Sequence, residues 1–241
     1  MTSNDPFKHH PALRDMITNP KDSFFRDFNP ESLDEMMNEQ GFGPDWRLSH
    51  EEREASRHKA LEGFRDQDLW IFGYGSLCWD PGIEFKEVRR AYVASYARKF
   101  ILKDTLGGVG DREQPGLMAA LDTGPGCHGL VFRIDKEIVE AETYRLWSRE
   151  RIIPAYIETF VEVETDQGVV TALTFVADHS ADSIDVNISR QEQIRCLTTG
   201  SGFLGTSIDY IINLKKSLES IGIIDPDLDD LLAEALDETV D

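Results

Sequence analysis

The sequence predicts an α+β fold, and three observations lead to this expectation. Segments with strand-like alternation and segments with helical periodicity are interspersed along the chain. The strand-like segments are joined by short turns as hairpins and do not alternate regularly with helices, as they would in a parallel sheet. The 241 residues include 13 Phe, 6 Tyr and 4 Trp, and 40% of the chain is apolar, which is enough to fill a substantial core.

The first part of the chain differs in composition from the rest, which indicates an appended segment. It is rich in Asp, Glu, Asn, Arg, His and Pro, and two helix starts are legible in it. Asn29 precedes a proline in a first turn, and Ser49 with Glu52 forms a capping box. The length allows one domain with an appendage or two small domains. We expect an acidic helical N-terminal extension (1–67) that packs on the domain or on a partner subunit, a main domain (68–224) and an acidic C-terminal helix (225–241).

The elements of the main domain follow from the periodicity of apolar residues. The predicted strands are Leu69–Phe72, Tyr92–Leu102, Gly116–Leu121, His128–Ile134, Tyr156–Glu164 and Val169–Ala177. The predicted helices run from Asp135 to near Trp147, from Ser189 to Leu197, and through Ile208, Ile211, Ile212, Leu218 and Ile221 to a stop at Gly222. The last 17 residues hold eight acids and no base, which favours a surface helix with a solvated acidic face.

Charge and composition exclude several classes of protein. The formal net charge of −20 disfavours binding to nucleic acids and to anionic membranes. No apolar run approaches the ~20 residues of a membrane span, and the N-terminus lacks the order of a secretion signal, so we expect cytoplasmic residence. Cys78, Cys127 and Cys196 are too far apart for a paired motif and are expected to be buried thiols. The histidine spacing matches no metal site.

The first candidate site is the sequence Gly73-Tyr-Gly-Ser76, where the apolar strand from Leu69 ends abruptly. Glycine permits a sharp turn or a close approach to the backbone. The segment lacks the third glycine of a dinucleotide fingerprint, a Walker lysine and the G-x-S-x-G order of a serine-hydrolase elbow. It could expose successive N–H groups to a carboxylate or an oxyanion. A simple tight turn explains the segment equally well.

Two further segments could carry chemistry. Glu150 lies between Arg149 and Arg151, just past the predicted end of a helix and before an apolar run. The helix end and apolar surroundings would raise the pKa of its carboxyl, whereas the arginines would lower it. A surface ion pair is the alternative. The small-residue segment Gly200–Gly202 leads toward Tyr210 and could place a helix N-terminus against an anion, or be a simple helix entry.

Several motifs in the same order resemble the ChaC-like γ-glutamylcyclotransferases, the glutathione-degrading branch of that superfamily. The matching segments are WIFGYGSLCW at 70–79, PG at 115–116, CHGLVFR at 127–133, RE at 149–150 and GSGFLGTSIDYIINL at 200–214. Together they span roughly residues 69–228. An ordered series of matches is far more specific than any one of them.

The resemblance implies a small mixed β-barrel surrounded by helices, with no metal and no organic cofactor. It implies that Glu150 is the general acid/base and that Tyr210 closes the pocket. It also implies that one loop binds the γ-glutamyl group, namely Ile71, Phe72, Gly73, Tyr74, Gly75, Ser76 and Leu77. The substrate would be a small γ-glutamyl compound, glutathione, cleaved to 5-oxoproline and Cys-Gly. Alternatives are other γ-glutamyl amino acids or amines, or a non-catalytic regulatory module that binds γ-glutamyl ligands.

The sequence departs from the pattern of this family at four positions. Trp147 stands where aspartate is common, Leu117 where arginine is usual, Ala155 where glycine is usual and Cys78 where methionine is frequent. The first two could change how the substrate is held. The glutamate and the glycine loop are intact.

Overall fold

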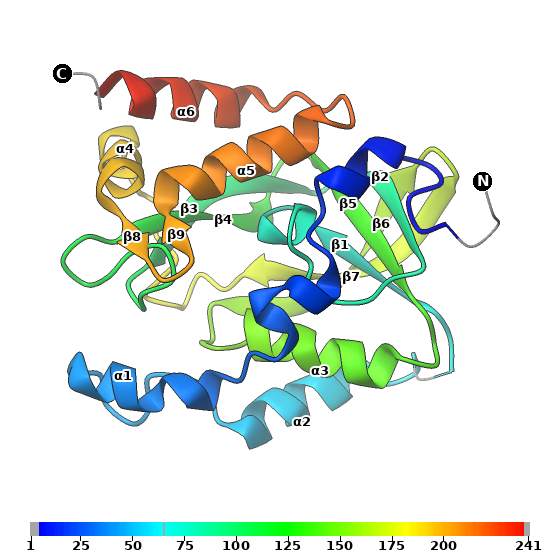
Figure 1. Ribbon diagram of the computed structural model, residues 1–241, viewed down its shortest axis with the longest axis horizontal. Coiled ribbons are helices and arrows are strands. Elements are labelled where there is room, and N and C mark those ends of the chain that lie inside the picture. Colours follow the sequence, from blue (N-terminus) through cyan, green and yellow to red (C-terminus); the bar gives the residue numbers. More distant parts are fainter. Residues whose placement is uncertain (1–4, 65, 239–241) are drawn as a thin grey trace.

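The computed structural model describes residues 5–64 and 66–238, and in these residues it shows a barrel between two groups of helices (Figure 1). The barrel strands are β1 (Leu69–Gly73), β2 (Glu87–Val93), β5 (Cys127–Ile134), β6 (Tyr156–Thr165) and β7 (Gly168–Ala177). They hydrogen-bond in the order β1-β5-β2-β6-β7, and a parallel β1–β7 pairing closes the circle. Closure leaves no free edge among these five strands. The α+β prediction and the mixed barrel are confirmed.

Two further strands extend the sheet beyond the barrel. β4 (Gly116–Thr123) pairs with β7, and β3 (Tyr96–Asp104) pairs with β4. The sequence predicts one long strand over 92–102, but the structure has two, β2 and β3, separated by a bend at residues 94–95. At this bend Val93 still pairs with Cys127, whereas Tyr96 pairs with Thr123 on the other side of the TGPG turn. Because the chain changes partner there, one periodic segment becomes two strands.

Helices cover the barrel on opposite sides (Figure 1). On one side α4 (Arg190–Thr199), α5 (Ser207–Glu219) and α6 (Pro226–Glu238) pack together, and on the other α2 (His50–Ala60) packs on α3 (Val139–Glu150). The short strands β8 (Ser201–Gly202) and β9 (Gly205–Thr206) form a small hairpin before α5. The leucines of α6 that face α4 and α5 are buried, so this acidic helix is anchored by its apolar face.

Alternate residues of β1 face two separate clusters of buried apolar residues, one on each side of the strand. This explains why the run Leu-Trp-Ile-Phe is apolar throughout. Leu69 and Ile71 pack toward α3 in a cluster with Trp147, and Phe72 packs in the larger cluster with Phe132. Neither face of this strand is exposed to solvent except at the partly buried Trp70. A strand of this kind shows a continuous apolar run instead of alternation.

The N-terminal extension lies against the main domain. It contains α1 (Asp34–Glu39), α2 and four 3₁₀ helices (Pro11–Asp15, Pro20–Asp22, Phe24–Arg26 and Pro30–Leu33). The predicted capping box of Ser49 and Glu52 is present at α2, and Asn29 caps a 3₁₀ turn. Arg57 of α2 forms an ion pair with Glu140 of α3. The domain boundaries drawn from composition stay a prediction.

Candidate active site

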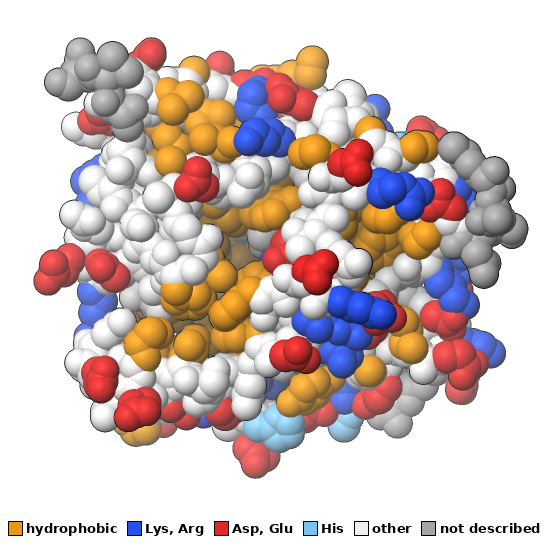
Figure 2. Space-filling model, in the orientation of Figure 1, with side chains coloured by type: hydrophobic (Ala, Val, Ile, Leu, Met, Phe, Trp, Pro, Cys, Tyr) orange, Lys and Arg blue, Asp and Glu red, His pale blue; other side chains and the backbone are white. Residues whose placement is uncertain are grey.

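A cavity of about 850 Å³ opens between one end of the barrel, α5 and the N-terminal extension. The face of the molecule shown in Figure 2 is hollowed near its middle, and apolar side chains gather around the hollow. Most of the polar groups that line the cavity come from the turn after β1, the end of β3, the end of α3, the start of β6, the segment after β7 and α5. A cavity of this size with few polar groups is the usual form of a small-molecule site.

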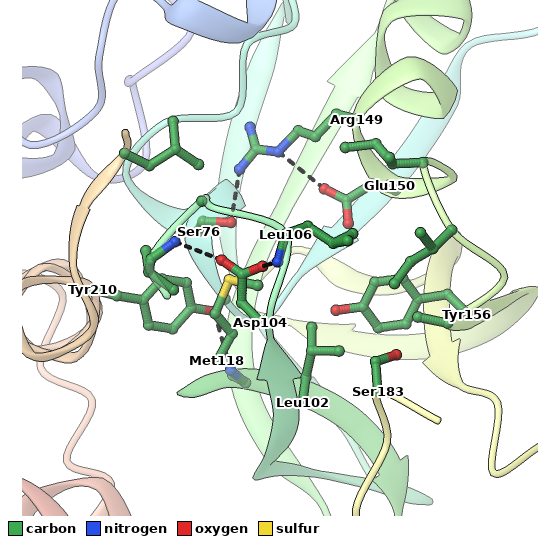
Figure 3. A pocket seen from close by; sticks show the side chains of 18 of the residues that line it. Ser76, Leu102, Asp104, Leu106, Met118, Arg149, Glu150, Tyr156, Ser183 and Tyr210 are labelled. Carbon is green, nitrogen blue, oxygen red and sulfur yellow. Dashed lines mark hydrogen bonds and ion pairs between the residues drawn. The ribbon is translucent and has the colours of Figure 1, made fainter. Parts of the chain in front are cut away.

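Glu150 is the last residue of α3, and its carboxylate faces the cavity (Figure 3). The sequence predicts a helix that ends near Trp147, but α3 continues for about one more turn and contains the glutamate. Only 15% of its side chain is exposed. Burial raises the pKa of the Glu150 carboxyl above its ordinary value of 4.5, and the Arg149 charge opposes this rise. A carboxyl with a raised pKa is suited to exchange protons near neutral pH.

Arg149 holds the neighbouring groups in place. Its Nε lies 3.1 Å from Oε1 of Glu150, and its guanidinium donates to the Ser76 hydroxyl at 2.7 Å (Figure 3). It also donates to the backbone carbonyl of Asp80 at 2.5 Å. The ring of Phe25, from the N-terminal extension, stacks 3.9 Å from the guanidinium carbon. The arginine therefore connects the glycine loop, the carboxylate and the extension.

The glycine loop is built by close packing and needs no left-handed backbone. A Cβ on Gly75 would lie 2.6 Å from the Tyr210 hydroxyl, and a Cβ on Gly73 would lie 2.8 Å from that of Leu77. Within the described residues, the backbone N–H groups of Gly75, Ser76 and Leu77 have no protein acceptor. Unpaired amides in succession are suited to binding an anion.

Seven of the nine site residues named from the sequence line this cavity: Phe72, Tyr74, Gly75, Ser76, Leu77, Glu150 and Tyr210. Ile71 and Gly73 lie in β1, paired with Phe132 and Leu130 of β5, and do not line it. The loop predicted over 71–77 is therefore the end of a strand, two connecting residues and a 3₁₀ turn (Ser76–Cys78). The functional roles assigned to these residues stay predictions.

Two tyrosine hydroxyls are fixed by the backbone. The Tyr74 hydroxyl donates to the carbonyl of Phe175 at 2.8 Å, and the Tyr210 hydroxyl accepts from the N–H of Ala119 at 3.3 Å. Burial raises the pKa of Tyr210 above its ordinary value of 10.0. Both phenol groups thus stay neutral, and their hydrogen bonds hold them at the edge of the cavity.

The sequence reasoning missed Tyr156, the first residue of β6. Its hydroxyl end is turned toward the cavity (Figure 3). Burial is the main cause that raises the pKa of Tyr156, and the charge of Glu150 adds to it. The sequence does show a tyrosine six residues after the glutamate, at the start of a predicted strand. The periodicity of apolar residues, however, does not distinguish a tyrosine that lines a cavity from one that packs in the core.

The third predicted segment does not present a free helix end. Thr206 caps α5 through its hydroxyl, which accepts from the N–H of Asp209, and Ser207 bonds to the backbone of Leu117. The segment is therefore the entry to the helix α5, and the first turn of that helix is capped by a side chain of the segment itself. Its contribution to the cavity is through Tyr210 and through Phe203 and Leu204 at the tip of the β8–β9 hairpin.

The departures from the family pattern are buried. Trp147 packs against Phe175, with 5.3 Å between ring centroids, and its Nε1 donates to the Ser56 hydroxyl of α2 at 3.0 Å. Leu117 is fully buried, and so is Cys78, where burial raises the pKa of the thiol to about 12. Of the four positions only Ala155 lines the cavity.

The three cysteines are buried and unpaired, as expected. Across residues 5–64 and 66–238, no group of three or more His, Cys, Asp or Glu side chains is placed to hold a metal ion. In the same residues no helix combines the length and the apolar character that crossing a bilayer requires.

The cavity at the end of this barrel has mostly buried carboxyl groups, Glu150 among them, beside unpaired backbone amides, which is the arrangement of a small-molecule site. The family model described as "ChaC-like protein" matches residues 69–241, so the chain belongs to the ChaC-like family. The match begins at the first residue of β1 and leaves out the N-terminal extension.

Characterised relatives agree with this assignment. The chain is 36% identical over 186 residues to the glutathione-specific γ-glutamylcyclotransferase of Escherichia coli K12, which covers 76% of this chain and 80% of the relative. It is 28% identical to glutathione-specific γ-glutamylcyclotransferase 1 of Rattus norvegicus, over 72% of this chain and 79% of the relative. The fold is similar to a crystal structure of a yeast γ-glutamyl cyclotransferase specific to glutathione, with a TM-score of 0.65, 18% identity, and coverage of 71% of this chain and 96% of that one.

Proposed function

We propose that this protein is a lyase that cleaves glutathione to 5-oxoproline and Cys-Gly, as the names of its ChaC-like relatives indicate for them. The observation that carries the proposal is the buried Glu150 carboxylate, whose pKa is raised, in the same cavity as the unpaired amides of the glycine loop. One group can move protons, and the others can hold an anion. The proposal needs no metal or organic cofactor, and its partner is a small molecule in the cytoplasm.

The reaction is an internal attack that the site must orient. The α-amine of the substrate attacks its own γ-carbonyl, a C–N bond forms, and the amide bond to the cysteine nitrogen breaks. No water is consumed. Because the nucleophile is tethered to the electrophile, a well-oriented geometry can supply about 7–11 kcal/mol of the barrier. Folding the γ-glutamyl chain into a ring-closing shape is therefore the first task of the cavity.

Glu150 carries out the proton transfers in this proposal. At pH 7 the α-amine is largely ammonium, with a pKa of about 8, and must lose a proton before it attacks. The Glu150 carboxylate accepts that proton and later delivers one to the leaving nitrogen. General acid–base work of this kind is typically worth ~10²–10⁴-fold. Arg149 fixes one carboxylate oxygen through its Nε, so the carboxylate cannot rotate freely.

The glycine loop binds the negative charge in this proposal. The N–H groups of Gly75, Ser76 and Leu77 can receive the α-carboxylate of the substrate or the oxyanion that develops on the γ-carbonyl. Gly75 has no side chain because Tyr210 occupies the space where one would be. In this proposal the turn after β1 presents its unpaired amides to the substrate.

Incubation with glutathione tests the proposal, with 5-oxoproline and Cys-Gly measured together in equal amounts. A panel with γ-glutamyl amino acids and γ-glutamyl amines distinguishes the alternatives. A preference for a γ-glutamyl amine would assign the protein to another branch of the superfamily. Binding of glutathione without either product would indicate a regulatory module.

A further inference from the structure

Most of an aromatic wall on one side of the cavity, formed by Phe24, Phe25, Phe28 and Phe203, comes from outside the matched family region. Five residues of the N-terminal extension line the cavity: Phe24, Phe25, Phe28, Leu33 and Trp46. All of them precede residue 69, where the family match begins. The catalytic end and this wall therefore have different origins in the sequence.

The wall is a connected set of rings. The centroid of Phe24 lies 5.3 Å from those of Phe25 and Phe28, and 5.7 Å from that of Phe203 at the tip of the β8–β9 hairpin. The N–H of Phe203 bonds to the carbonyl of Gly107 at 2.8 Å, which fixes the tip. These contacts join the extension to the loop around residue 107.

The central ring of this wall is left open to solvent. Phe24 is 51% exposed and Phe203 is 47% exposed, although their rings touch. Contiguous exposed apolar surface is unfavourable and generally marks a place where something binds. Both residues line the cavity, so the surface faces the same space as the catalytic carboxylate.

The wall begins next to the catalytic end. Phe25 stacks on Arg149, which contacts both Ser76 and Glu150. A γ-glutamyl group bound at the glycine loop would leave the rest of the cavity for the leaving peptide. The first side chain of that peptide is the cysteine, whose sulfur lies within a few bonds of the scissile amide.

Glutathione itself offers little apolar surface to an aromatic wall, because it carries two carboxylates, an ammonium and one small thiol. The cavity of about 850 Å³ is near the upper end of the ~300–1,000 Å³ range of sites that hold drug-sized ligands. We propose that the wall formed by Phe24, Phe25, Phe28 and Phe203 binds an apolar substituent on the cysteine sulfur, a proposal that rests on the proposed function. The protein then cleaves S-alkyl and S-aryl conjugates of glutathione.

The chemistry is that of the proposed function. The substrate's α-nitrogen forms a bond to the γ-carbon, the bond from that carbon to the cysteine nitrogen breaks, and the leaving nitrogen takes a proton. The products are 5-oxoproline and the S-substituted Cys-Gly. The C–S bond is untouched, and nothing is oxidised or reduced.

The experiment compares kcat/KM for glutathione, S-methylglutathione, S-hexylglutathione and S-benzylglutathione, in the full chain and in two variants. Phe24→Ala removes the central ring of the wall. Phe42→Ala is the matched control, because Phe42 belongs to the same extension, stacks on Arg112 and does not line the cavity. Thermal unfolding of each variant checks that the fold is kept.

We expect kcat/KM to rise from the methyl to the hexyl and benzyl conjugates. Phe24→Ala should lower the ratio of kcat/KM for S-hexylglutathione to that for glutathione about tenfold, and Phe42→Ala should leave this ratio unchanged. Turnover of glutathione without turnover of the hexyl and benzyl conjugates overturns this proposal and leaves the proposed function standing. A ratio that Phe24→Ala does not change also overturns it. Absence of 5-oxoproline from every substrate overturns both proposals.

Discussion

The two ends of the cavity differ in how they are built. At the catalytic end, the Glu150 carboxylate is mostly buried, and Arg149 is held by Ser76 and by the Asp80 carbonyl. At the aromatic wall, Phe24 and Phe203 are about half exposed, and their rings pack against each other. The first end lies within the matched family region, and most of the wall lies outside it. Proton transfer demands fixed geometry in a dry site, whereas an apolar wall needs only area and can change without disturbing the chemistry.

Glu150→Gln should have the largest effect, because it removes the group that we propose transfers protons and preserves its shape. We expect 5-oxoproline formation to fall by at least ~10²-fold. Glu162→Gln is the matched control, since Glu162 is an exposed glutamate of β6 outside the cavity. Retained turnover in Glu150→Gln would remove this residue from the mechanism.

Gly75→Ala tests whether the glycine loop depends on close packing. The added Cβ would lie 2.6 Å from the Tyr210 hydroxyl, and overpacking of this kind costs about 1–3 kcal/mol. We expect kcat/KM to fall roughly tenfold and the unfolding temperature to fall as well. Tyr210→Phe in the same chain should recover part of the stability because it removes the atom in contact.

Gly43→Ala serves as the control for this substitution, since a Cβ there meets nothing within 4 Å. Full activity and unchanged stability of Gly75→Ala would show that the loop is looser than the contacts indicate.

The pH dependence of kcat/KM reports the state of Glu150. The carboxyl accepts a proton only when ionised, and burial raises its pKa above 4.5, so activity should fall with decreasing pH at a point above 4.5. The same shift affects stability with a defined sign. A carboxyl whose pKa is raised on folding costs nothing below its unfolded pKa. Its destabilising effect grows as pH rises from the unfolded to the folded pKa and is constant above the folded value.

Glu150→Gln should therefore unfold at a higher temperature than the parent at pH 7 and at the same temperature near pH 4. Each kcal/mol regained corresponds to about 2–4 °C in a chain of this size. A variant less stable than the parent at pH 7 would contradict the raised pKa.

Ser56→Ala should have the smallest effect, since it perturbs the seam between the extension and α3 and no group of the cavity. The substitution leaves the Nε1 of Trp147 and the Glu158 carboxylate without the Ser56 hydroxyl as a partner, and the expected cost is about 1–2 kcal/mol in the free energy of unfolding. Combined with Trp147→Phe, the loss should be less than additive, because both changes remove the same hydrogen bond. Chemical denaturation of the four chains measures this. If the two losses in the free energy of unfolding added exactly, the hydrogen bond between Trp147 and Ser56 would be contradicted.

The sequence contained enough information to find both halves of the catalytic end, but only as separate motifs. A glycine pair after an apolar strand, and a glutamate between arginines, are local patterns that can be read from residue types alone. Their meeting depends on Arg149, which bonds to Ser76 across 73 residues of chain. Periodicity carries no information on contacts of that range. The same limit explains why Tyr156 was missed.

The predicted helix over 135–147 shows the local limit of the same reasoning. The apolar spacing identified the helix but not its end, because Arg149 and Glu150 resemble a polar stop signal. In the structure these two residues remain helical, since the cavity and the glycine loop provide partners for their charged groups. Tertiary contacts therefore extended the helix beyond the point where local propensity suggested an end.

The sequence by itself determined the α+β class, the positions of most strands and helices, the buried thiols and the candidate glutamate, because these depend on neighbouring residues and on periodicity. Only the tertiary structure decided that the barrel closes through β1 and β7, that Glu150 is buried beside the glycine loop, and that the rings of the N-terminal extension complete its cavity. These outcomes depend on residues far apart in the chain. Burial and the resulting shift in pKa arise only once those residues exclude water together.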